Sequence, residues 1–247
     1  MPEELIRPGE RLDDLQNGFY LIQDPAGFCF GMDAVLLSSF AKVHPKDNVL
    51  DLGTGTGILP VLLAARSEGT VFTGLEIQSA SADLARRSII YNHLEDRVTI
   101  IEGDIKEAAA LFGAASFRVV VCNPPYLPCG HGKENVSARV SAARHEIFCT
   151  LEDVISRTAV ILKDHGRFYM VHRPRRLCEI IGMLVRYRLE PKRLRFVHPY
   201  VDKEPNMVLI EAVKGVNPGL RTDAPLIVCE SGGGFTEEIK EIYAGKR

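Results

Sequence analysis

Residues 49–57 read VLDLGTGTG, and they indicate the fold of the chain. A short apolar segment with a single acid suits a buried strand, and the glycines after it allow a sharp turn and a close approach of the backbone to a ligand. An apolar helix is predicted directly after the turn, at 57–66. The N-terminus of that helix favours an anionic group of a ligand. The stretch therefore predicts a strand, a ligand-binding turn and a helix in succession.

On both sides of this turn, β-rich segments alternate with helix-like ones. Strands are predicted at 49–52, 70–76, 97–102, 117–122, 166–172, 189–197 and 207–213, and helices at 57–66, 79–92, 105–112, 151–162 and 175–187. This alternation predicts an α/β fold with a Rossmann-like, doubly wound, seven-stranded sheet that has helices on both faces. The last two strands are joined by 198–206 without a helix, so the final strand is expected to be antiparallel.

The ends of the chain differ from this pattern. Residues 1–46 are expected to form an N-terminal extension, with a β-hairpin of 19–23 and 28–30 followed by a helix near 34–41. The main domain is predicted to span 47–214. Residues 215–247 are rich in glycine and proline, and we expect a tail that packs on the domain and closes with a short helix from Thr236.

Composition excludes several classes of protein. The chain has 247 residues, 46% of them hydrophobic, and a net charge of −2, so it does not bind nucleic acid by bulk positive charge. Its six cysteines form no Cys-x-x-Cys pair and no zinc spacing, which predicts no metal site and a reducing cytoplasm. The N-terminus lacks the pattern of a signal peptide, and the longest apolar run, 58–65, is too short to span a membrane.

The glycine turn differs from two common nucleotide motifs. Its order is G-x-G-x-G with Ile58 at the last position of the dinucleotide fingerprint, and no lysine of a phosphate-binding loop follows. Glu76 ends the next predicted strand, about 20 residues on, where an acid can accept both hydroxyls of a ribose. Asp104 follows the third strand and is placed to meet an adenine amino group. Each acid alone is compatible with an exposed strand end, but together they predict a nucleoside site.

The fourth strand ends in Asn123, Pro124, Pro125 and Tyr126. Two prolines restrict the backbone and remove two donors, so Asn123 is held rigidly at the carboxyl end of its strand. The Asn123 side-chain oxygen and the Pro124 carbonyl form a pair of acceptors suited to a planar amino group, and Tyr126 offers a flat face for stacking. The alternative for these residues is a rigid turn with a half-buried tyrosine.

In order and spacing, these motifs resemble those of the class I S-adenosylmethionine-dependent methyltransferases that modify exocyclic or amide nitrogen. The resemblance implies S-adenosyl-L-methionine as cofactor and S-adenosyl-L-homocysteine as product. It implies a cofactor site of Asp33, Asp51, Gly53, Thr54, Gly55, Gly57, Glu76, Ile77, Asp104, Ile105 and Asn123, and a catalytic set of Asn123, Pro124 and Tyr126.

Flanking segments narrow the resemblance. Residues 28–37 (FCFGMDAVLL), 143–146 (ARHE), 204–206 (EPN) and 225–228 (PLIV) are similar to segments of the bacterial tRNA(Val) adenine-N6 methyltransferase family. This implies methylation of an adenine next to the anticodon of tRNA(Val). From the composition we expect a cytoplasmic protein with no membrane association, and we infer no obligate protein partner.

A tRNA substrate requires cations. Residues 163–195 contain ten lysines and arginines against three acids. The residues predicted to contact RNA are Lys133, Arg139, Arg144, Arg173, Arg175 and Arg176. The alternative for this stretch is a solvated charged face.

Three other functions remain open. Release-factor glutamine methyltransferases share the Asn-Pro-Pro-Tyr turn, although they carry a longer helical N-terminal domain. Ribosomal RNA guanine-N2 methylation uses similar chemistry. A non-catalytic RNA-binding module on the same fold is the third, because fold does not guarantee activity.

Overall fold

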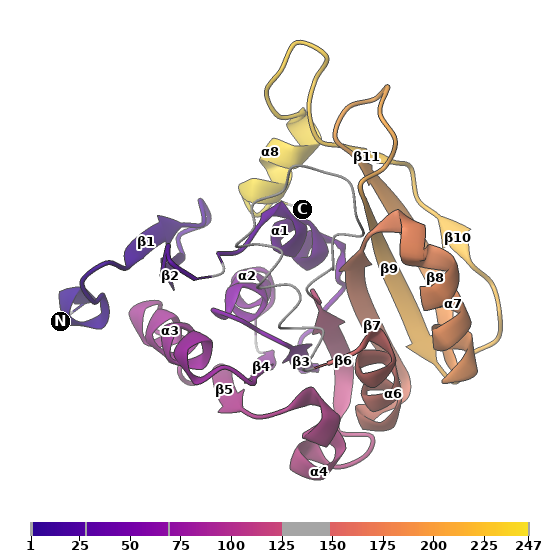
Figure 1. Ribbon diagram of the computed structural model, residues 1–247, viewed down its shortest axis with the longest axis horizontal. Coiled ribbons are helices and arrows are strands. Elements are labelled where there is room, and N and C mark those ends of the chain that lie inside the picture. The colour runs from indigo at the N-terminus through magenta and orange to yellow at the C-terminus, as the bar shows by residue number, and fades with distance from the viewer. Residues whose placement is uncertain (1, 28, 69, 125–148, 247) are drawn as a thin grey trace.

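A parallel sheet with helices on both faces forms the centre of the molecule (Figure 1). The computed structural model describes residues 2–27, 29–68, 70–124 and 149–246. The principal strands are β3 (Asn48–Leu52), β4 (Val71–Glu76), β5 (Val98–Glu102), β6 (Phe117–Cys122), β7 (Leu162–His172), β8 (Leu189–His198) and β9 (Met207–Lys214). The helices that accompany them are α1 (Met32–Phe40), α2 (Ile58–Arg66), α3 (Ser79–Tyr91), α4 (Ala108–Phe112), α6 (Leu151–Ile161) and α7 (Leu177–Arg186).

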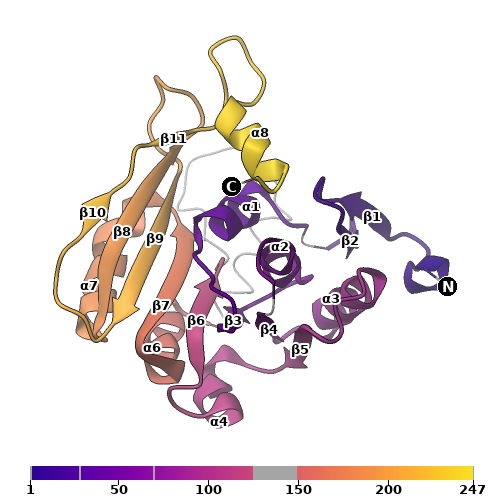
Figure 2. The same cartoon turned by 180° about the vertical axis from the view of Figure 1, so that it is seen from behind.

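The order of the strands confirms the predicted architecture. Strands β5, β4, β3, β6 and β7 are parallel neighbours, and β9 lies antiparallel between β7 and β8. The seven predicted strands and the antiparallel final strand are therefore present. Two short strands from the tail, β10 (Arg221–Thr222) and β11 (Leu226–Ile227), pair with β8 and bring the sheet to nine strands within the described residues (Figure 2).

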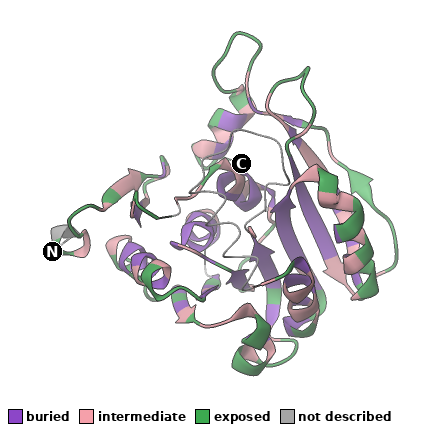
Figure 3. Ribbon diagram, in the orientation of Figure 1, coloured by how far each residue is buried: buried purple, intermediate pink, exposed green. Residues whose placement is uncertain are grey.

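Alternate residues of the central strands enter two separate cores. In β6, Val119 and Val121 pack with helices α1, α2 and α3, whereas Val120 and Cys122 pack with α4, α6 and α7. The central strands are buried along their length, while the helices expose their outer sides (Figure 3). Burial on both faces explains why the sequence of β6 is almost continuously apolar rather than alternating.

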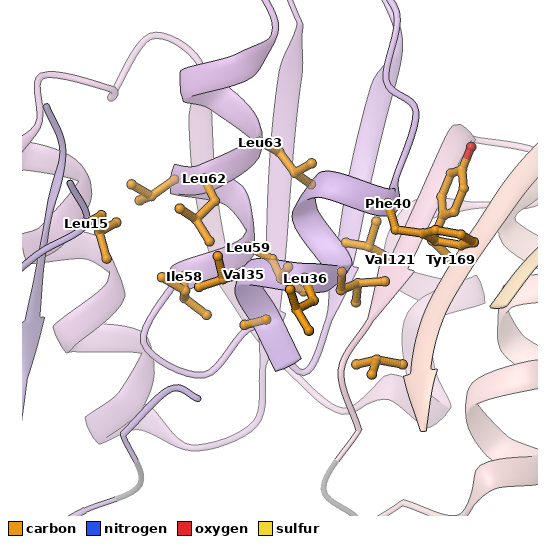
Figure 4. Packing of buried hydrophobic residues seen from close by; sticks show 14 of the residues in the cluster. Leu15, Val35, Leu36, Phe40, Ile58, Leu59, Leu62, Leu63, Val121 and Tyr169 are labelled. Atoms are coloured by element: carbon orange, nitrogen blue, oxygen red, sulfur yellow. The ribbon is translucent and has the colours of Figure 1, made fainter. Parts of the chain in front are cut away.

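Helices α1 and α2 pack closely against the first of these cores. Figure 4 shows Val35 and Leu36 of α1 beside Leu59 of α2, with Phe40 next to Tyr169 of β7. The rings of Phe40 and Tyr169 meet edge to face with their centroids 6.1 Å apart. Because α1 belongs to the N-terminal extension, the extension contributes directly to the core of the main sheet.

The N-terminal hairpin is present, but its pairing differs from the prediction. Strand β2 (Tyr20–Gln23) pairs with β1 (Arg11–Asp14), which precedes it, and residues 29 and 30, the described part of the predicted partner, form no strand. Residues 24–27 do make a turn, closed by the Gly27 amide and the Asp24 carbonyl at 3.0 Å. After the turn, however, the Phe30 amide donates to the side-chain oxygen of Gln23 rather than to the backbone of β2. The Gln23 side chain therefore accepts the hydrogen bond that the Phe30 amide would have given to a neighbouring strand.

Two helices begin with a side-chain cap. The Thr150 side chain accepts a hydrogen bond from the Asp153 amide, and the Asp153 carboxylate accepts one from the Thr150 amide, so α6 begins with a complete capping box. Thr236 caps α8 (Glu237–Tyr243) in the same manner, by accepting from the Ile239 amide. Helix α8 packs against α1 in the upper part of Figure 1.

Candidate functional site

The carboxyl ends of β6, β3, β4 and β5 meet at one edge of the sheet, and the predicted site residues follow these ends. The amides of Gly53 and Thr54 both donate to the Leu75 carbonyl, at 2.9 and 3.0 Å. The Gly103 amide donates to the Glu76 carbonyl at 2.9 Å. These bonds hold the segments after β3, β4 and β5 side by side, which is where open α/β sheets bind ligands.

Two glycines of the turn have different physical roles. Gly55 has a φ of +57°, and a Cβ placed on it would meet nothing within 4 Å, so its backbone faces open space. Gly57 has a φ of +87°, and a Cβ there would lie 3.1 Å from the Cβ of Ala85 on α3. Gly57 thus allows α2 and α3 to pack closely, whereas the side of the turn at Gly55 is left open to a ligand.

Glu76 is a buried carboxylate at the end of β4, with 3% of its surface exposed. One oxygen accepts from the Gly55 amide at 2.8 Å and the other from the Gln78 amide at 2.9 Å. An ionised carboxylate has about four acceptor positions, so each oxygen can accept a further donor. Glu76 therefore fixes the glycine turn and retains the capacity to accept the two hydroxyls of a ribose.

Asp51 lies behind the same turn, 2% exposed, and neither of its carboxylate oxygens has a hydrogen-bond partner among the described residues. Burial raises the pKa of Asp51 to about 7; the neighbouring Thr54 hydroxyl opposes this rise, and the charge of Glu76 adds to it. The Thr54 hydroxyl is also buried and lacks a well-aligned partner in the described part of the chain. Unsatisfied buried acceptors are costly, so this pair fits a site that receives donors from a ligand.

Asp104, Ile77 and Ile105 line the ends of β4 and β5. Asp104 is half-buried and caps the turn that follows it by accepting from the Lys106 amide at 2.9 Å. A Cβ on Gly53 would lie 3.8 Å from the Ile105 Cδ1, so this side chain flanks the glycine turn. Ile77 directly follows Glu76 and is 37% exposed, which is unusual for isoleucine. Two apolar side chains and an acid are a suitable environment for a purine with an exocyclic amine.

Asn123 and Pro124 directly follow β6 and are half-buried. The register of β3 and β6 pairs Asp51 with Val121. Asn123, two residues after Val121, therefore comes to the level of Gly53, two residues after Asp51. The structure thus brings Asn123 to the same edge as the glycine turn. Tyr126 and the predicted RNA contacts Lys133, Arg139 and Arg144 lie outside the described residues.

Asp33 lies in the first turn of α1, where one carboxylate oxygen accepts from the Ala34 amide at 2.9 Å. Burial raises the pKa of Tyr243 in α8, and the charge of Asp33 raises it further. Helix α1, which carries Asp33, packs against this C-terminal helix. The contact of Asp33 with a cofactor stays a prediction.

Three of the predicted RNA contacts lie at the same edge of the sheet, directly after β7. Arg173 donates to the Asn206 carbonyl at 3.1 Å, and Arg176 forms a two-pronged ion pair with Glu179, with both contacts at 2.7 Å. Arg175 is exposed at the start of the segment that leads into α7. Because β7 pairs with β6, the three residues come to the same end of the sheet as Asn123. The charge of Arg176 is balanced by Glu179.

The basic stretch 163–195 does not form a single surface. Arg193 is 8% exposed and forms ion pairs with Glu211 at 2.7 Å and Asp223 at 3.2 Å. Arg195 pairs with Glu238 at 2.9 Å. These cations are neutralised within the fold, so the charge excess counted in the sequence overstates the charge available to a ligand.

Gln23 is a site residue that sequence reasoning missed. Its side-chain amide is fully buried and donates to the Thr56 hydroxyl, inside the glycine turn, at 2.7 Å. A polar residue at the end of a strand carries no signal of such a contact, because the partner is 33 positions away.

Among the described residues, no group of three or more His, Cys, Asp and Glu side chains could hold a metal ion. In the same part of the chain, no helix has the length and apolar character needed to cross a membrane.

Comparison with known proteins gives consistent matches. The model of the methyltransferase small domain family matches residues 30–181. The tRNA1(Val) (adenine(37)-N6)-methyltransferase of Porphyromonas gingivalis is 32% identical over 188 residues, which cover 73% of this chain and 72% of that protein. The protein of the same name from Aeromonas salmonicida is 28% identical over 217 residues, 87% of this chain and 88% of that one.

Solved structures share the fold. A predicted O-methyltransferase from Agrobacterium tumefaciens superimposes with a TM-score of 0.72 at 26% identity, covering 87% of this chain and 97% of that chain. Geranyl diphosphate C-methyltransferase from Streptomyces coelicolor A3(2), solved with S-adenosyl-L-homocysteine, gives a TM-score of 0.57 at 17% identity, covering 74% and 78% of the two chains. At that identity the second match indicates a common fold alone.

Proposed function

The chain belongs to the methyltransferase small domain family and is an S-adenosylmethionine-dependent methyltransferase, and we propose that it methylates N6 of an adenine in tRNA. The observation that supports this most strongly is the position of Asn123 and Pro124, at the level of the glycine turn on the same edge of the sheet. The relatives named as tRNA1(Val) (adenine(37)-N6)-methyltransferases support the choice of substrate and the position next to the anticodon.

The cofactor would be held by residues that this edge already brings together. Glu76 would accept the ribose hydroxyls, and Asp104 would accept from the adenine amino group between the side chains of Ile77 and Ile105. Asp51 and Thr54 would receive donors from the methionine part at the glycine turn. When bound, S-adenosylmethionine supplies a methyl group on a sulfonium, which is a strong electrophile.

Asn123 and Pro124 would bind and orient the amine to be methylated. An aromatic amine is a weak nucleophile because its lone pair is delocalised into the ring. The Asn123 side-chain oxygen and the Pro124 carbonyl would each accept one N–H of the amine, which localises the lone pair and aligns it for transfer. The displaced proton would pass to solvent, so this mechanism requires positioning and no strong general base. Tyr126 would stack on the adenine after it leaves its own stack.

RNA would be bound next to this pocket. We assign Arg173, Arg175 and Arg176 to contacts with phosphates, because they directly follow β7 at the edge where Asn123 lies. An unpaired base in an anticodon loop leaves its stack at low cost, which favours such a substrate over a duplex. With a tRNA substrate and free thiols at all five cysteines of the described residues, we place the protein in the cytoplasm.

A labelling experiment tests the substrate. Purified protein and tritiated S-adenosylmethionine are incubated separately with bulk tRNA, ribosomal RNA and release factor, and the labelled tRNA is digested to nucleosides. We expect label in tRNA, as N6-methyladenosine, with no label when Asn123→Ala protein is used. Label confined to release factor or to ribosomal RNA would contradict the proposed substrate, and no label in any pool would favour a binding module.

A further inference from the structure

Gln23 connects its own strand with the glycine turn, 33 residues away, and with the segment that leads into α1. Its Nε2 donates to the Thr56 hydroxyl at 2.7 Å and, more weakly, to the Ile22 carbonyl at 3.4 Å. Its Oε1 accepts from the Phe30 amide at 3.3 Å. The side chain is completely buried. One amide therefore joins β2 of the hairpin, the glycine turn and the segment that leads into α1.

The contact with Thr56 is at a sensitive place in the turn. Thr56 lies between two glycines in left-handed conformations, Gly55 at φ +57° and Gly57 at φ +87°. Glycines have a wide choice of backbone conformations, so the turn requires external contacts to keep one shape. Glu76 holds the turn through the Gly55 amide, and Gln23 holds it through the Thr56 side chain. The two contacts approach the turn from different elements.

The strand that carries Gln23 is itself fixed. The Ile22 amide donates to the Ser88 hydroxyl at 2.9 Å, and the Tyr20 amide donates to the Asn92 side-chain oxygen at 2.8 Å. Both partners belong to the region of α3. Gln23 is thus held by a strand that is attached to the main domain independently of the glycine turn.

We propose that Gln23 is a positioning residue for the cofactor, which holds the glycine turn in its binding conformation through Thr56. The N-terminal hairpin then acts as part of the cofactor site and not only as a cover for the core. This inference rests on the proposed use of S-adenosylmethionine. Without Gln23, the turn samples other conformations, and the binding-competent fraction falls. The affinity for the cofactor falls by the same factor.

The first test uses Gln23→Met, which is close in length to glutamine but cannot make the polar contacts. Isothermal titration with S-adenosyl-L-homocysteine should give a dissociation constant about tenfold higher than that of the wild type, equivalent to about 1.4 kcal/mol. The matched control is Ser88→Ala, which removes a bond that holds β2 but leaves the contact with Thr56. It should lower stability while the dissociation constant stays within about twofold of the wild type.

A second pair of variants approaches the contact from its partner and does not depend on Gln23→Met folding. Thr56→Val should weaken binding by about the same factor, and Thr56→Ser, which keeps the hydroxyl, should restore it. The double variant Gln23→Met/Thr56→Val should bind no more weakly than either single one, because both remove the same hydrogen bond.

The outcomes separate this inference from the proposed function. If Gln23→Met or Thr56→Val had the same dissociation constant as Ser88→Ala, the role of Gln23 would be overturned, and the proposed function would be unaffected. A roughly hundredfold loss in the double variant would do the same, because it would mean two independent effects. If the wild type did not bind S-adenosyl-L-homocysteine, the proposed function would fail, and this inference with it.

Discussion

Asp51 is a carboxylate that the fold buries beside the proposed cofactor site without giving it a partner among the described residues. A protein core normally satisfies such a group, because an unpaired buried acceptor destabilises the native state. The raised pKa of Asp51 follows from this burial. We interpret Asp51 as a residue that lowers the stability of the folded protein and contributes to ligand binding, as is common for functional sites.

Replacement of Asp51 by asparagine should therefore change how stability depends on pH. Because the pKa of Asp51 is raised from 3.8 to about 7 in the folded chain, folding favours its protonated form between these values. Between these values the unfolded chain has lost this proton while the folded chain still holds it. The free energy of unfolding therefore falls as the pH rises through this window. Relative to the wild type, Asp51→Asn should gain about 1 kcal/mol of stability per pH unit up to about pH 7, and nothing more above it. Urea unfolding of both proteins at about pH 5, 6, 7 and 8 measures the difference in their free energies of unfolding. A constant offset between the two proteins at every pH would contradict the prediction.

At the scale of residues, the glycines and acids of the site could be predicted because their signal is local. Asp51 and Glu76 each stand at the end of a predicted strand, and the sheet brings such ends together. Gln23 could not be predicted, because its importance arises from a tertiary contact with Thr56. The availability of the arginines also depends on tertiary contacts, since Arg193 and Arg175 have the same sequence signal but opposite exposure.

At the scale of elements, α7 places its two ends at opposite edges of the sheet. Arg175 precedes its first turn at the edge where Asn123 lies, and Arg186 is its last residue, at the other edge. The two arginines are exposed and carry the same charge. Arg186 pairs with Glu152 at 3.1 Å, but both side chains of this pair are largely exposed, so the two arginines can be compared in a test of where RNA binds.

Arg175→Ala should weaken the binding of tRNA several-fold and reduce the slope of log affinity against log salt concentration by about 1, because one phosphate contact is lost. Arg186→Ala removes the same charge far from the site and should change neither quantity. Fluorescence anisotropy with labelled tRNA between low and moderate salt measures both. Equal losses in the two variants would indicate a diffuse charge effect and would contradict an RNA surface at the carboxyl edge.

The elements that could be predicted from sequence are those with a strong local periodicity or with clear cap and turn residues. The capping box of Thr150 and Asp153 at the start of α6 and the apolar run of β6 are signals of this kind. The predicted partner strand of β2 was wrong. A turn at 24–27 indicates that the chain reverses, but it does not indicate that a strand follows. Strands β10 and β11 have two residues each and form by pairing with β8. They are too short to show an alternating pattern in the sequence.

At the scale of the molecule, one buried network joins the N-terminal extension, the sheet and the tail. Arg193 of β8 pairs with Glu211 of β9 and Asp223 of the tail, and it donates to the Phe40 carbonyl of α1 at 2.7 Å. Its guanidinium also stacks 3.8 Å from the centre of the Phe40 ring. We propose that the predicted segments 1–46, 47–214 and 215–247 unfold together because of these contacts.

Loss of Arg193 should be costly, because it leaves the carboxylate of Glu211 buried without its partner. Arg193→Ala should lower the free energy of unfolding by about 3–5 kcal/mol. Arg195→Ala, two residues along the same strand, breaks a more exposed pair with Glu238 and should cost about 1 kcal/mol or less. Urea titration followed by circular dichroism compares the two, and the wild type should show a single transition. Similar losses in both variants, or a separate early transition of the tail, would contradict the proposed coupling.

We propose that Glu76 holds the cofactor and that Asn123 mainly holds the amine, and the variant Asn123→Ala tests this division most directly. In one set of experiments, the dissociation constant of S-adenosyl-L-homocysteine and the rate of methyl transfer to tRNA are measured for this variant and for Glu76→Ala. We expect Asn123→Ala to bind the cofactor nearly as well as the wild type but to lose at least about a hundredfold in transfer. Glu76→Ala should lose cofactor affinity first, since it releases the Gly55 and Gln78 amides as well as the ribose contact. Wild-type transfer by Asn123→Ala, or equal losses of binding and transfer in both variants, would contradict the assignment of the site.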